Sequence, residues 1–300
     1  MPEPPRISVV IPVLNEEDSV DRLVTALRGT LGSGCELIFV DDGSTDATWT
    51  RLKALHESGC VRLVRFRRNF GKTAALMAGF RLTRGDVVIT MDGDLQDDPS
   101  EIPRFVSKIK EGYGLVSGWK RARHDPWHKV AASRIFNFVV AWVTGLRLHD
   151  INCGFKAYRG DLARSLRLHG EMHRFIPVIV AAQGLRIAEI EVTHHARKYG
   201  RSKYGFARLF KGCFDLVTVS LLTRFRERPA HLFGFASLPF FAAALVLALS
   251  GIFPLYVLAG VFWISGVILL AAGWVAEMVA GLAAAAAGQT PLYSIEEQLD

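Results

Sequence analysis

Apolar residues follow two alternating patterns over the first hundred positions of the chain. Short runs rich in β-branched residues predict strands at Ile7–Val13, Glu36–Val40, Val61–Phe66 and Asp86–Met91. Between these runs, apolar residues recur at helical spacing within Val20–Leu27, Leu52–Leu55 and Thr73–Leu82. Because predicted strands and helices alternate, we expect an α/β fold with a mostly parallel sheet and helices on both of its faces.

A second pattern lies toward the C-terminus, where residues 229–276 contain no Asp, Glu, Lys or Arg. One unbroken helix over this segment would rise roughly 70 Å, which is too long for a hydrocarbon core of about 30 Å. Pro254 divides the segment near its middle. Within residues 230–280 we therefore expect two transmembrane helices, Leu232–Phe253 and Leu255–Ala276; two buried helices in a soluble core are the alternative.

The net charge of +7 is concentrated next to this apolar segment. Residues 197–228 hold nine Lys or Arg and two acidic residues, a surplus equal to that of the whole chain. Because cationic flanks stay on the cytoplasmic side, we expect residues 1–200 and a tail at 281–300 to be cytoplasmic in an integral protein of the cell inner membrane or its equivalent. Apolar residues at helical spacing predict juxtamembrane amphipathic helices over residues 201–229; packing on the cytoplasmic domain is the alternative.

Composition excludes several classes of protein. Half of the residues are hydrophobic and 22% are charged, which excludes a disordered or collagen-like chain. The four cysteines form no CxxC pair, which indicates a reducing compartment. The basic surplus beside an apolar segment favours membrane lipids over nucleic acid as a partner, since no nucleic-acid-binding motif accompanies it. Neither GxGxxG after a strand nor a P-loop occurs, so a nucleotide would bind without a glycine-rich phosphate loop.

Polar residues follow three of the predicted strands directly, at the edge where parallel sheets bind ligands. Asn15 and Glu16 follow the first strand, and Asp41 and Asp42 follow the second. The fourth strand ends in the segment 92–96, Asp-Gly-Asp-Leu-Gln. These three strand ends form the candidate site.

The segment after the fourth strand has the residue types of a divalent metal site. Asp92, Asp94 and Gln96 occupy alternate positions, so on an extended strand end all three would turn to one side. Their oxygens suit Mg²⁺ or Mn²⁺, with phosphate and water completing the shell. Asp98 instead begins a capping box with Glu101 and is expected to be structural, while the role of Asp97 stays open.

Seven motifs together resemble a known family. PVLNE at 12–16, DDGSTD at 41–46, RNFGK at 68–72 and DGDLQDDP at 92–99 resemble family 2 glycosyltransferases, whose fold is the Rossmann-like GT-A fold. NCGFKAYR at 152–159, HRF at 173–175 and RKYGRSKYG at 197–205 are similar to the polyprenyl-phosphate glycosyltransferases, the group that contains dolichyl-phosphate mannose synthase and bactoprenol glucosyltransferases. The resemblance covers essentially the whole chain and implies an inverting, metal-dependent hexosyltransferase. It would move one sugar from a UDP- or GDP-sugar to a polyprenyl phosphate.

The resemblance also implies residue roles. The nucleotide-sugar donor would contact Pro12, Asn15, Glu16, Asp41, Asp42, Lys72 and Asp92. The metal ion would be held by Asp92, Asp94 and Gln96. The acceptor phosphate would contact Lys120, Arg121, Lys129, Ser133, Arg134, Arg197, Ser202 and Lys203. Asp92, Asp94, Arg134 and Arg197 are the expected catalytic residues; for the loosely matched basic residues, a solvated or lipid-facing charge is the alternative.

The chemistry of the acceptor separates the possible functions. A lipid phosphate, with a second pKa of about 6, is largely ionised at pH 7, so its transfer reaction needs no catalytic base. Transfer to a lipid or protein hydroxyl would need one, such as Asp97. A membrane scaffold that binds nucleotide sugar without transfer is the third possibility. The processive-synthase signature QxxRW is absent, and a homo-oligomer is expected only by analogy.

Overall fold

The computed structural model describes residues 6–32, 34–121, 137–142, 144–195 and 295–299, with isolated positions between 218 and 282. The chain divides into two units, Met1–Phe210 with Pro291–Asp300, and Lys211–Thr290. Almost all of the second unit lies outside the described residues. The fold is therefore given for the first unit.

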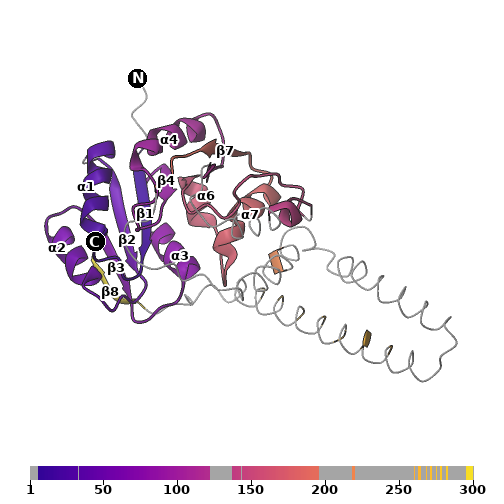
Figure 1. The fold of residues 1–300 in the computed structure, drawn as a ribbon, viewed down its shortest axis with the longest axis horizontal. Coiled ribbons are helices and arrows are strands. Elements are labelled where there is room, and N and C mark those ends of the chain that lie inside the picture. Colours follow the sequence, from indigo (N-terminus) through magenta and orange to yellow (C-terminus); the bar gives the residue numbers. More distant parts are fainter. Residues whose placement is uncertain are drawn as a thin grey trace. The chain divides into compact units, whose positions relative to one another are not determined.

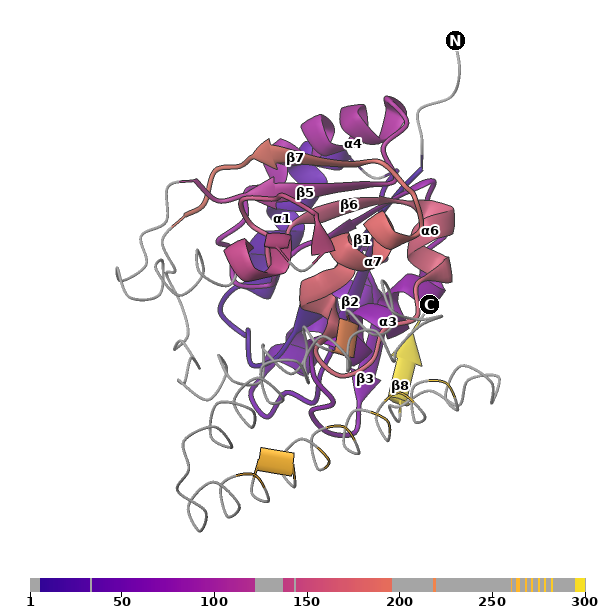
Figure 2. The same cartoon turned by 90° about the vertical axis from the view of Figure 1, so that its right-hand side faces the viewer.

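A single mixed sheet forms the centre of this unit, with the strand order β7-β5-β6-β4-β1-β2-β3-β8 (Figures 1 and 2). Strands β5 and β6 are labelled in Figure 2. The strands are β1 (Ile7–Val13), β2 (Glu36–Asp41), β3 (Arg62–Phe66), β4 (Val87–Thr90), β5 (Leu115–Trp119), β6 (Lys156–Arg159), β7 (Ile187–Glu191) and β8 (Ile295–Leu299). Strands β4, β1, β2 and β3 are parallel, and β5 is parallel to β7. Strand β6 runs antiparallel to β4 and β5, and β8 runs antiparallel to β3. The predicted mostly parallel sheet is confirmed.

Helices cover both faces of the sheet (Figures 1 and 2). One face carries α1 (Val20–Leu31), α2 (Thr48–Glu57) and α4 (Ile102–Lys110), the last preceded by the 3₁₀ turn η1 (Pro99–Glu101). The other carries α3 (Lys72–Leu82), α6 (Gly160–Ser165) and α7 (Ile176–Ala182), with the 3₁₀ turn η2 (Met172–Phe175) between α6 and α7. The three helices and four strands predicted over the first hundred residues all form, with ends shifted by one or a few positions.

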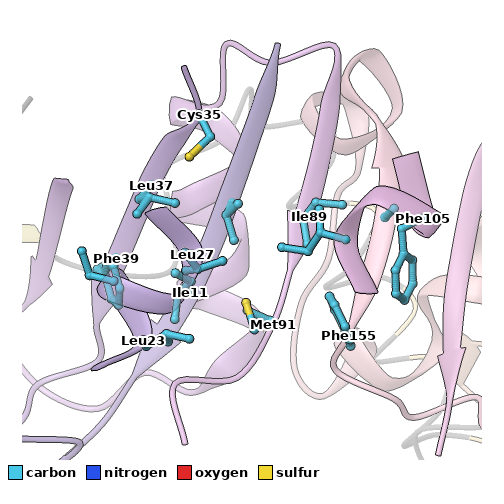
Figure 3. Close-up of a cluster of buried hydrophobic side chains, with 14 of the residues drawn as sticks. Ile11, Leu23, Leu27, Cys35, Leu37, Phe39, Ile89, Met91, Phe105 and Phe155 are labelled. Carbon is cyan, nitrogen blue, oxygen red and sulfur yellow. The ribbon is translucent and has the colours of Figure 1, made fainter. Parts of the chain in front are cut away.

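The core lies between the sheet and the first group of helices. Ile11 and Phe39 from the sheet meet Leu23 and Leu27 from α1, and all four are fully buried (Figure 3). Burial of a large aliphatic or aromatic side chain contributes about 1.5–3 kcal/mol. On the opposite face α3 approaches β1 closely, because a Cβ at Gly79 would lie 2.2 Å from Val10 Cγ1. These layers hold the carboxyl ends of β1, β2 and β4 at one edge.

The C-terminal residues return to the central sheet. The tail, predicted only as a segment at 281–300, contains β8, whose Leu299 lies in register with Leu63 of β3. Within the part of the chain that the structure describes, no helix combines the length and the apolar character needed to cross a membrane. The predicted spans at 232–253 and 255–276 and the amphipathic helices at 201–229 lie outside the described residues, apart from isolated positions.

Candidate active site

The loops after β1 and β2 are joined by hydrogen bonds. Asn15 has φ +57°, in the left-handed region that Asn tolerates, and its Oδ1 accepts from Thr45 N at 2.8 Å. In return, Asn15 N donates to Ser44 Oγ at 2.9 Å, and Glu16 N donates to Thr48 Oγ1 at 2.8 Å. The structure therefore brings the predicted donor ligands Asn15 and Glu16 against the Asp41–Asp46 motif.

Asp42 connects this motif to the loop before α3. Its Oδ1 accepts from Phe70 N at 2.7 Å and its Oδ2 from Gly71 N at 2.9 Å. Burial raises the pKa of Asp42, although both N–H groups favour the carboxylate. Gly43, at φ +77°, is required here, because a Cβ would lie 2.7 Å from Arg68 C. The motifs at 41–46 and 68–72 thus form one structure.

Asp41 lies inside the protein. Its side chain is fully buried, its Oδ1 accepts from Ser44 N at 2.9 Å, and its Oδ2 lies 3.6 Å from Arg65 Nε. Burial raises its pKa. In this position Asp41 shapes the turn, and a direct contact with a nucleotide stays a prediction. Pro12 lies in β1, in register with Val40 at the same edge.

The segment 92–96 forms a turn. The prediction of an extended strand end is wrong, because β4 ends at Thr90 and Leu95 adopts φ +60°, which reverses the chain. Gln96 N donates to Asp94 Oδ1 at 3.2 Å, and Asp94 is buried. The glycine between the aspartates lies against the β1 loop, since a Cβ at Gly93 would lie 3.7 Å from Glu16 Cγ. The candidate metal turn therefore adjoins the candidate donor ligands.

Asp92 forms an ion pair with Lys72, the first residue of α3. Burial acts to raise the pKa of Asp92, but the Lys72 ammonium outweighs it and the pKa is lowered. Gly154 leaves room for the pair, because a Cβ there would lie 2.9 Å from Asp92 Oδ2 and 3.0 Å from Lys72 Nζ. Lys72 and Asp92, which are both predicted to bind the nucleotide sugar, are thus in contact, and the Asp92 carboxylate is ionised.

Asp97 is buried behind the turn and paired with Lys120. Lys120 Nζ lies 2.7 Å from Asp97 Oδ1, and His194 Nδ1 lies 3.8 Å from the same atom. Burial acts to raise the pKa of Asp97, but the Lys120 ammonium holds it well below its usual range. The pair in turn raises the pKa of Lys120. Lys120, which is predicted to bind the acceptor phosphate, therefore lies directly beside the candidate metal turn.

The segment 193–195 also packs on this turn. His195 N donates to Gln96 O at 2.9 Å, and Gln96 Nε2 donates to His195 O at 3.3 Å. Two residues further along the chain is Arg197. Arg121 is exposed, with Nη1 3.4 Å from Glu191 Oε2. The remaining predicted acceptor residues, Lys129, Ser133, Arg134, Arg197, Ser202 and Lys203, lie outside the described residues.

The residues of the turn suit a divalent ion. The side-chain amide nitrogen of Gln96 donates a hydrogen bond to His195 O. The amide oxygen of the same side chain is the atom that an ion would bind. In the described ranges no three His, Cys, Asp or Glu side chains gather to hold a metal by themselves. An ion here would therefore depend on Asp92, Asp94 and Gln96 together with phosphate oxygens, as Mg²⁺ sites commonly do.

The capping of η1 and the buried Lys156 differ from what the sequence predicts. Asp98 caps η1 as predicted, with Oδ1 accepting from Ser100 N at 2.9 Å, but Glu101 accepts from Thr193 Oγ1 at 3.1 Å and does not complete the capping box. Lys156, which is not among the predicted site residues, is only 2% exposed and lines a small pocket together with Lys72. A lysine between Phe155 and Ala157 in an apolar run was the available signal.

Comparisons with known proteins show which family the chain is similar to. Residues 8–167 match the family described as Glycosyl transferase family 2. The chain is 39% identical to the dodecaprenyl-phosphate galacturonate synthase of Rhizobium johnstonii, over 91% of this chain and 87% of that protein. It is 40% identical to the undecaprenyl-phosphate 4-deoxy-4-formamido-L-arabinose transferase of Serratia proteamaculans, over 74% and 69%.

Solved structures share the fold. Glucosyl-3-phosphoglycerate synthase from Mycobacterium tuberculosis, in complex with phosphoglyceric acid, superimposes with a TM-score of 0.57 at 25% identity, over 73% of this chain and 80% of that one. A complex of that enzyme with Mn²⁺, UDP and glucosyl-3-phosphoglycerate gives 0.57 at 24% identity over the same shares, which shows the fold alone. With a match over more than half of its length and relatives aligned along most of both chains, the protein belongs to glycosyl transferase family 2.

Proposed function

We propose that the protein transfers one sugar from a nucleotide-diphosphate sugar, with UDP or GDP as carrier, to a polyprenyl phosphate, with inversion at the anomeric carbon. The relatives named above act on dodecaprenyl and undecaprenyl phosphates. The observation that carries the proposal is the contact between the two halves of the site. Lys120, which is expected to bind the acceptor phosphate, lies 2.7 Å from Asp97, the residue that directly follows the turn with the expected metal ligands Asp92, Asp94 and Gln96.

On the donor side, Asp92, Asp94 and Gln96 would hold Mg²⁺ or Mn²⁺. When bound, such an ion supplies positive charge to the departing nucleotide diphosphate. Lys72, which contacts Asp92, adds a further cation at the same position. The loops at Asn15–Glu16 and Asp41–Asp46, which are joined by hydrogen bonds, lie beside the candidate metal turn, and the nucleoside would bind there.

On the acceptor side, the chain needs to bind and orient a phosphate that is already ionised. Cations held in place supply that orientation, and bringing two reactants into line is itself a large contribution to rate. Transfer to a hydroxyl would instead need a base with access to the acceptor. Asp97 is poorly suited to that role, because its side chain is fully buried, is paired with Lys120 and has a low pKa. A phosphate acceptor is therefore the function we propose.

The C-terminal strand supports the proposed membrane arrangement. Because β8 hydrogen-bonds to β3, residues 295–299 and the catalytic sheet lie on the same side of any membrane that the intervening segment crosses. Two crossings by the charge-free residues 229–276 satisfy this condition, and a single crossing does not. With the basic residues 197–228 at the cytoplasmic surface, the site would meet lipid headgroups there.

A donor panel tests the proposal. Membranes containing the protein are incubated with radiolabelled UDP- and GDP-sugars and polyprenyl phosphate, and lipid extracts are analysed for a labelled product. We expect a single sugar on the lipid phosphate, formed only with Mg²⁺ or Mn²⁺ and lost with EDTA. Transfer to a polyprenol or protein hydroxyl, with polyprenyl phosphate inactive, would contradict the proposal.

A further inference from the structure

The segment 193–195 is held against the candidate metal turn by backbone contacts. His195 N donates to Gln96 O at 2.9 Å, and Asp97 pairs with His194 in an isolated antiparallel bridge. The segment follows β7 and the turn follows β4, so the two come from different parts of the fold. These contacts fix the backbone positions that carry the His194 and Gln96 side chains relative to each other.

The same segment sets the orientation of the Gln96 side-chain amide. Gln96 Nε2 lies 3.3 Å from His195 O, and a carbonyl oxygen only accepts hydrogen bonds. The end of the amide that faces the segment is therefore the NH₂ group, which has two hydrogens to donate. Gln96 Nε2 also lies 3.4 Å from His194 Nε2, which is thus the acceptor for the second hydrogen. The amide oxygen is then the end that does not face the segment.

His194 can accept this hydrogen bond because of the group at its other ring nitrogen. Nδ1 lies 3.8 Å from Asp97 Oδ1, which is too long for a hydrogen bond but close enough for a carboxylate to favour a proton on Nδ1. Lys120, 2.7 Å from the same oxygen, keeps Asp97 ionised. A neutral imidazole with its proton on Nδ1 has a lone pair on Nε2, as the Gln96 amide requires.

A histidine beside a metal turn could instead bind the ion itself. The His194 side chain is only 13% exposed, and each of its ring nitrogens already faces a protein group, Nδ1 facing Asp97 and Nε2 facing Gln96. Directing Nε2 at an ion would break the contact with Gln96, one of the three expected metal ligands. The arrangement therefore favours a role behind the ligand, where residues commonly orient the groups that hold a metal.

We propose, on the basis of the proposed function, that His194 is a positioning residue that holds the Gln96 amide with its oxygen toward the divalent ion. In the absence of the Nε2 acceptor, the amide can turn over and present its NH₂ group, which cannot bind a cation. Because the other side of the imidazole faces Asp97, His194 also lies between the metal turn and the ion pair that holds Lys120.

Two substitutions of His194 separate its two nitrogens. His194→Gln places a side-chain oxygen near the position of Nε2 and can still accept from Gln96, whereas the shorter His194→Asn replaces only Nδ1. His56→Asn is the matched control away from the site. His56, on α2, contacts Val61 O through Nδ1 at 2.8 Å, a contact that Asn can keep.

The first experiment measures Mn²⁺ binding, so it does not depend on turnover. The full-length protein in detergent is titrated with Mn²⁺ in the presence of UDP and, in parallel, GDP, and free Mn²⁺ is measured by EPR. We expect roughly 10- to 100-fold weaker binding in His194→Asn, and binding within about 3-fold of wild type in His194→Gln and His56→Asn. Wild-type affinity in His194→Asn, or an equal loss in both His194 variants, would overturn the inference. Either result would leave the transfer reaction of the wild-type protein, and so the proposed function, intact.

A double-mutant cycle tests whether His194 acts through Gln96. If it does, His194→Asn should weaken Mn²⁺ binding by no more than about 2-fold when added to Gln96→Ala, because the group that it orients is already absent. Losses that simply multiply in the double variant would show that His194 affects the ion by another route and would contradict the proposal.

Pulsed EPR of the wild-type protein with Mn²⁺ and UDP or GDP provides a test that requires no variant to fold. A positioning residue is not bonded to the ion, so we expect no directly bound nitrogen from His194 in the spectrum. A strong nitrogen coupling that disappears in His194→Gln would show that His194 is itself a ligand, and the positioning role would then be wrong.

Discussion

Lys120 forms a buried ion pair with Asp97, with 2.7 Å between Nζ and Oδ1. The two residues come from different parts of the fold, the end of β5 and the turn after β4. Because the Asp97 side chain is fully buried, removal of Lys120 would leave an uncompensated charge inside the protein. The ion pair therefore both stabilises the fold and fixes the position of Lys120, which is predicted to bind the acceptor phosphate.

Lys120→Met should destabilise the protein by about 3–5 kcal/mol, the usual result of breaking a buried pair from one side. Adding Asp97→Asn to this variant should recover much of the loss, because no buried charge is then unpaired. If Lys120 also binds the acceptor phosphate, transfer stays impaired in the stable double variant. Thermal unfolding in detergent and the lipid-product assay measure the two effects. A double variant with wild-type transfer would show that Lys120 acts only in structure; Arg121→Met, on an exposed neighbour, is the control.

The local parts of this site could be predicted from sequence, and the long-range pairs could not. The strand ends at Asp41 and Asp92 follow from apolar runs and their polar neighbours, since both are local signals. Pairing of Asp97 with Lys120 and burial of Lys156 depend on strands β5 and β6, which enter the sheet out of sequence order. The extended conformation predicted for residues 92–96 is wrong because Leu95 adopts a left-handed backbone conformation. Leu rarely adopts this conformation, so the residue type gives no indication of the turn.

Asp94→Asn should abolish transfer, by at least about 100-fold, because a neutral amide is a weaker ligand for a divalent ion than a carboxylate. The measurement is release of nucleoside diphosphate by purified protein in detergent with Mg²⁺ or Mn²⁺. Asp98→Asn is the control, since Asn retains the capping hydrogen bond to Ser100 N and should leave the rate unchanged. Normal turnover in Asp94→Asn would contradict the metal assignment.

Gly43→Ala tests the contact between the loops at residues 41–46 and 68–72. Gly59→Ala is the matched control, because Gly59 has nearly the same backbone φ as Gly43. Both glycines have positive φ, +77° and +74°, but a Cβ at Gly43 meets the Arg68 backbone at 2.7 Å, whereas at Gly59 nothing lies within 4 Å. Gly59→Ala should cost about 1–2 kcal/mol for the left-handed conformation alone. Gly43→Ala should cost clearly more and also weaken nucleotide binding. Similar losses of unfolding free energy for the two variants would mean that the close approach to Arg68 is unimportant.

Glu36 predicts a pH-dependent contribution to stability away from the site. Its carboxylate accepts from the Ser8 hydroxyl, from Arg62 and, at 3.0 Å, from Arg84 N. Burial acts to raise the pKa of Glu36, but these donors outweigh it and lower the pKa. A lowered pKa in the folded state means that the stabilisation is present above the unfolded-state value of about 4.3 and is lost as the pH falls through the folded-state value.

Glu36→Gln should therefore destabilise the protein by about 1–3 kcal/mol at pH 7, and the difference from wild type should shrink as the pH is lowered toward about 3. Unfolding by denaturant at several pH values measures this change. Glu57→Gln, at an exposed position near the end of α2, should change stability by less than about 0.5 kcal/mol throughout. A loss in Glu36→Gln that is the same at acidic and neutral pH would show that shape and hydrogen-bond count, and not the carboxylate charge, hold β1, β2 and β3 together at this end of the sheet.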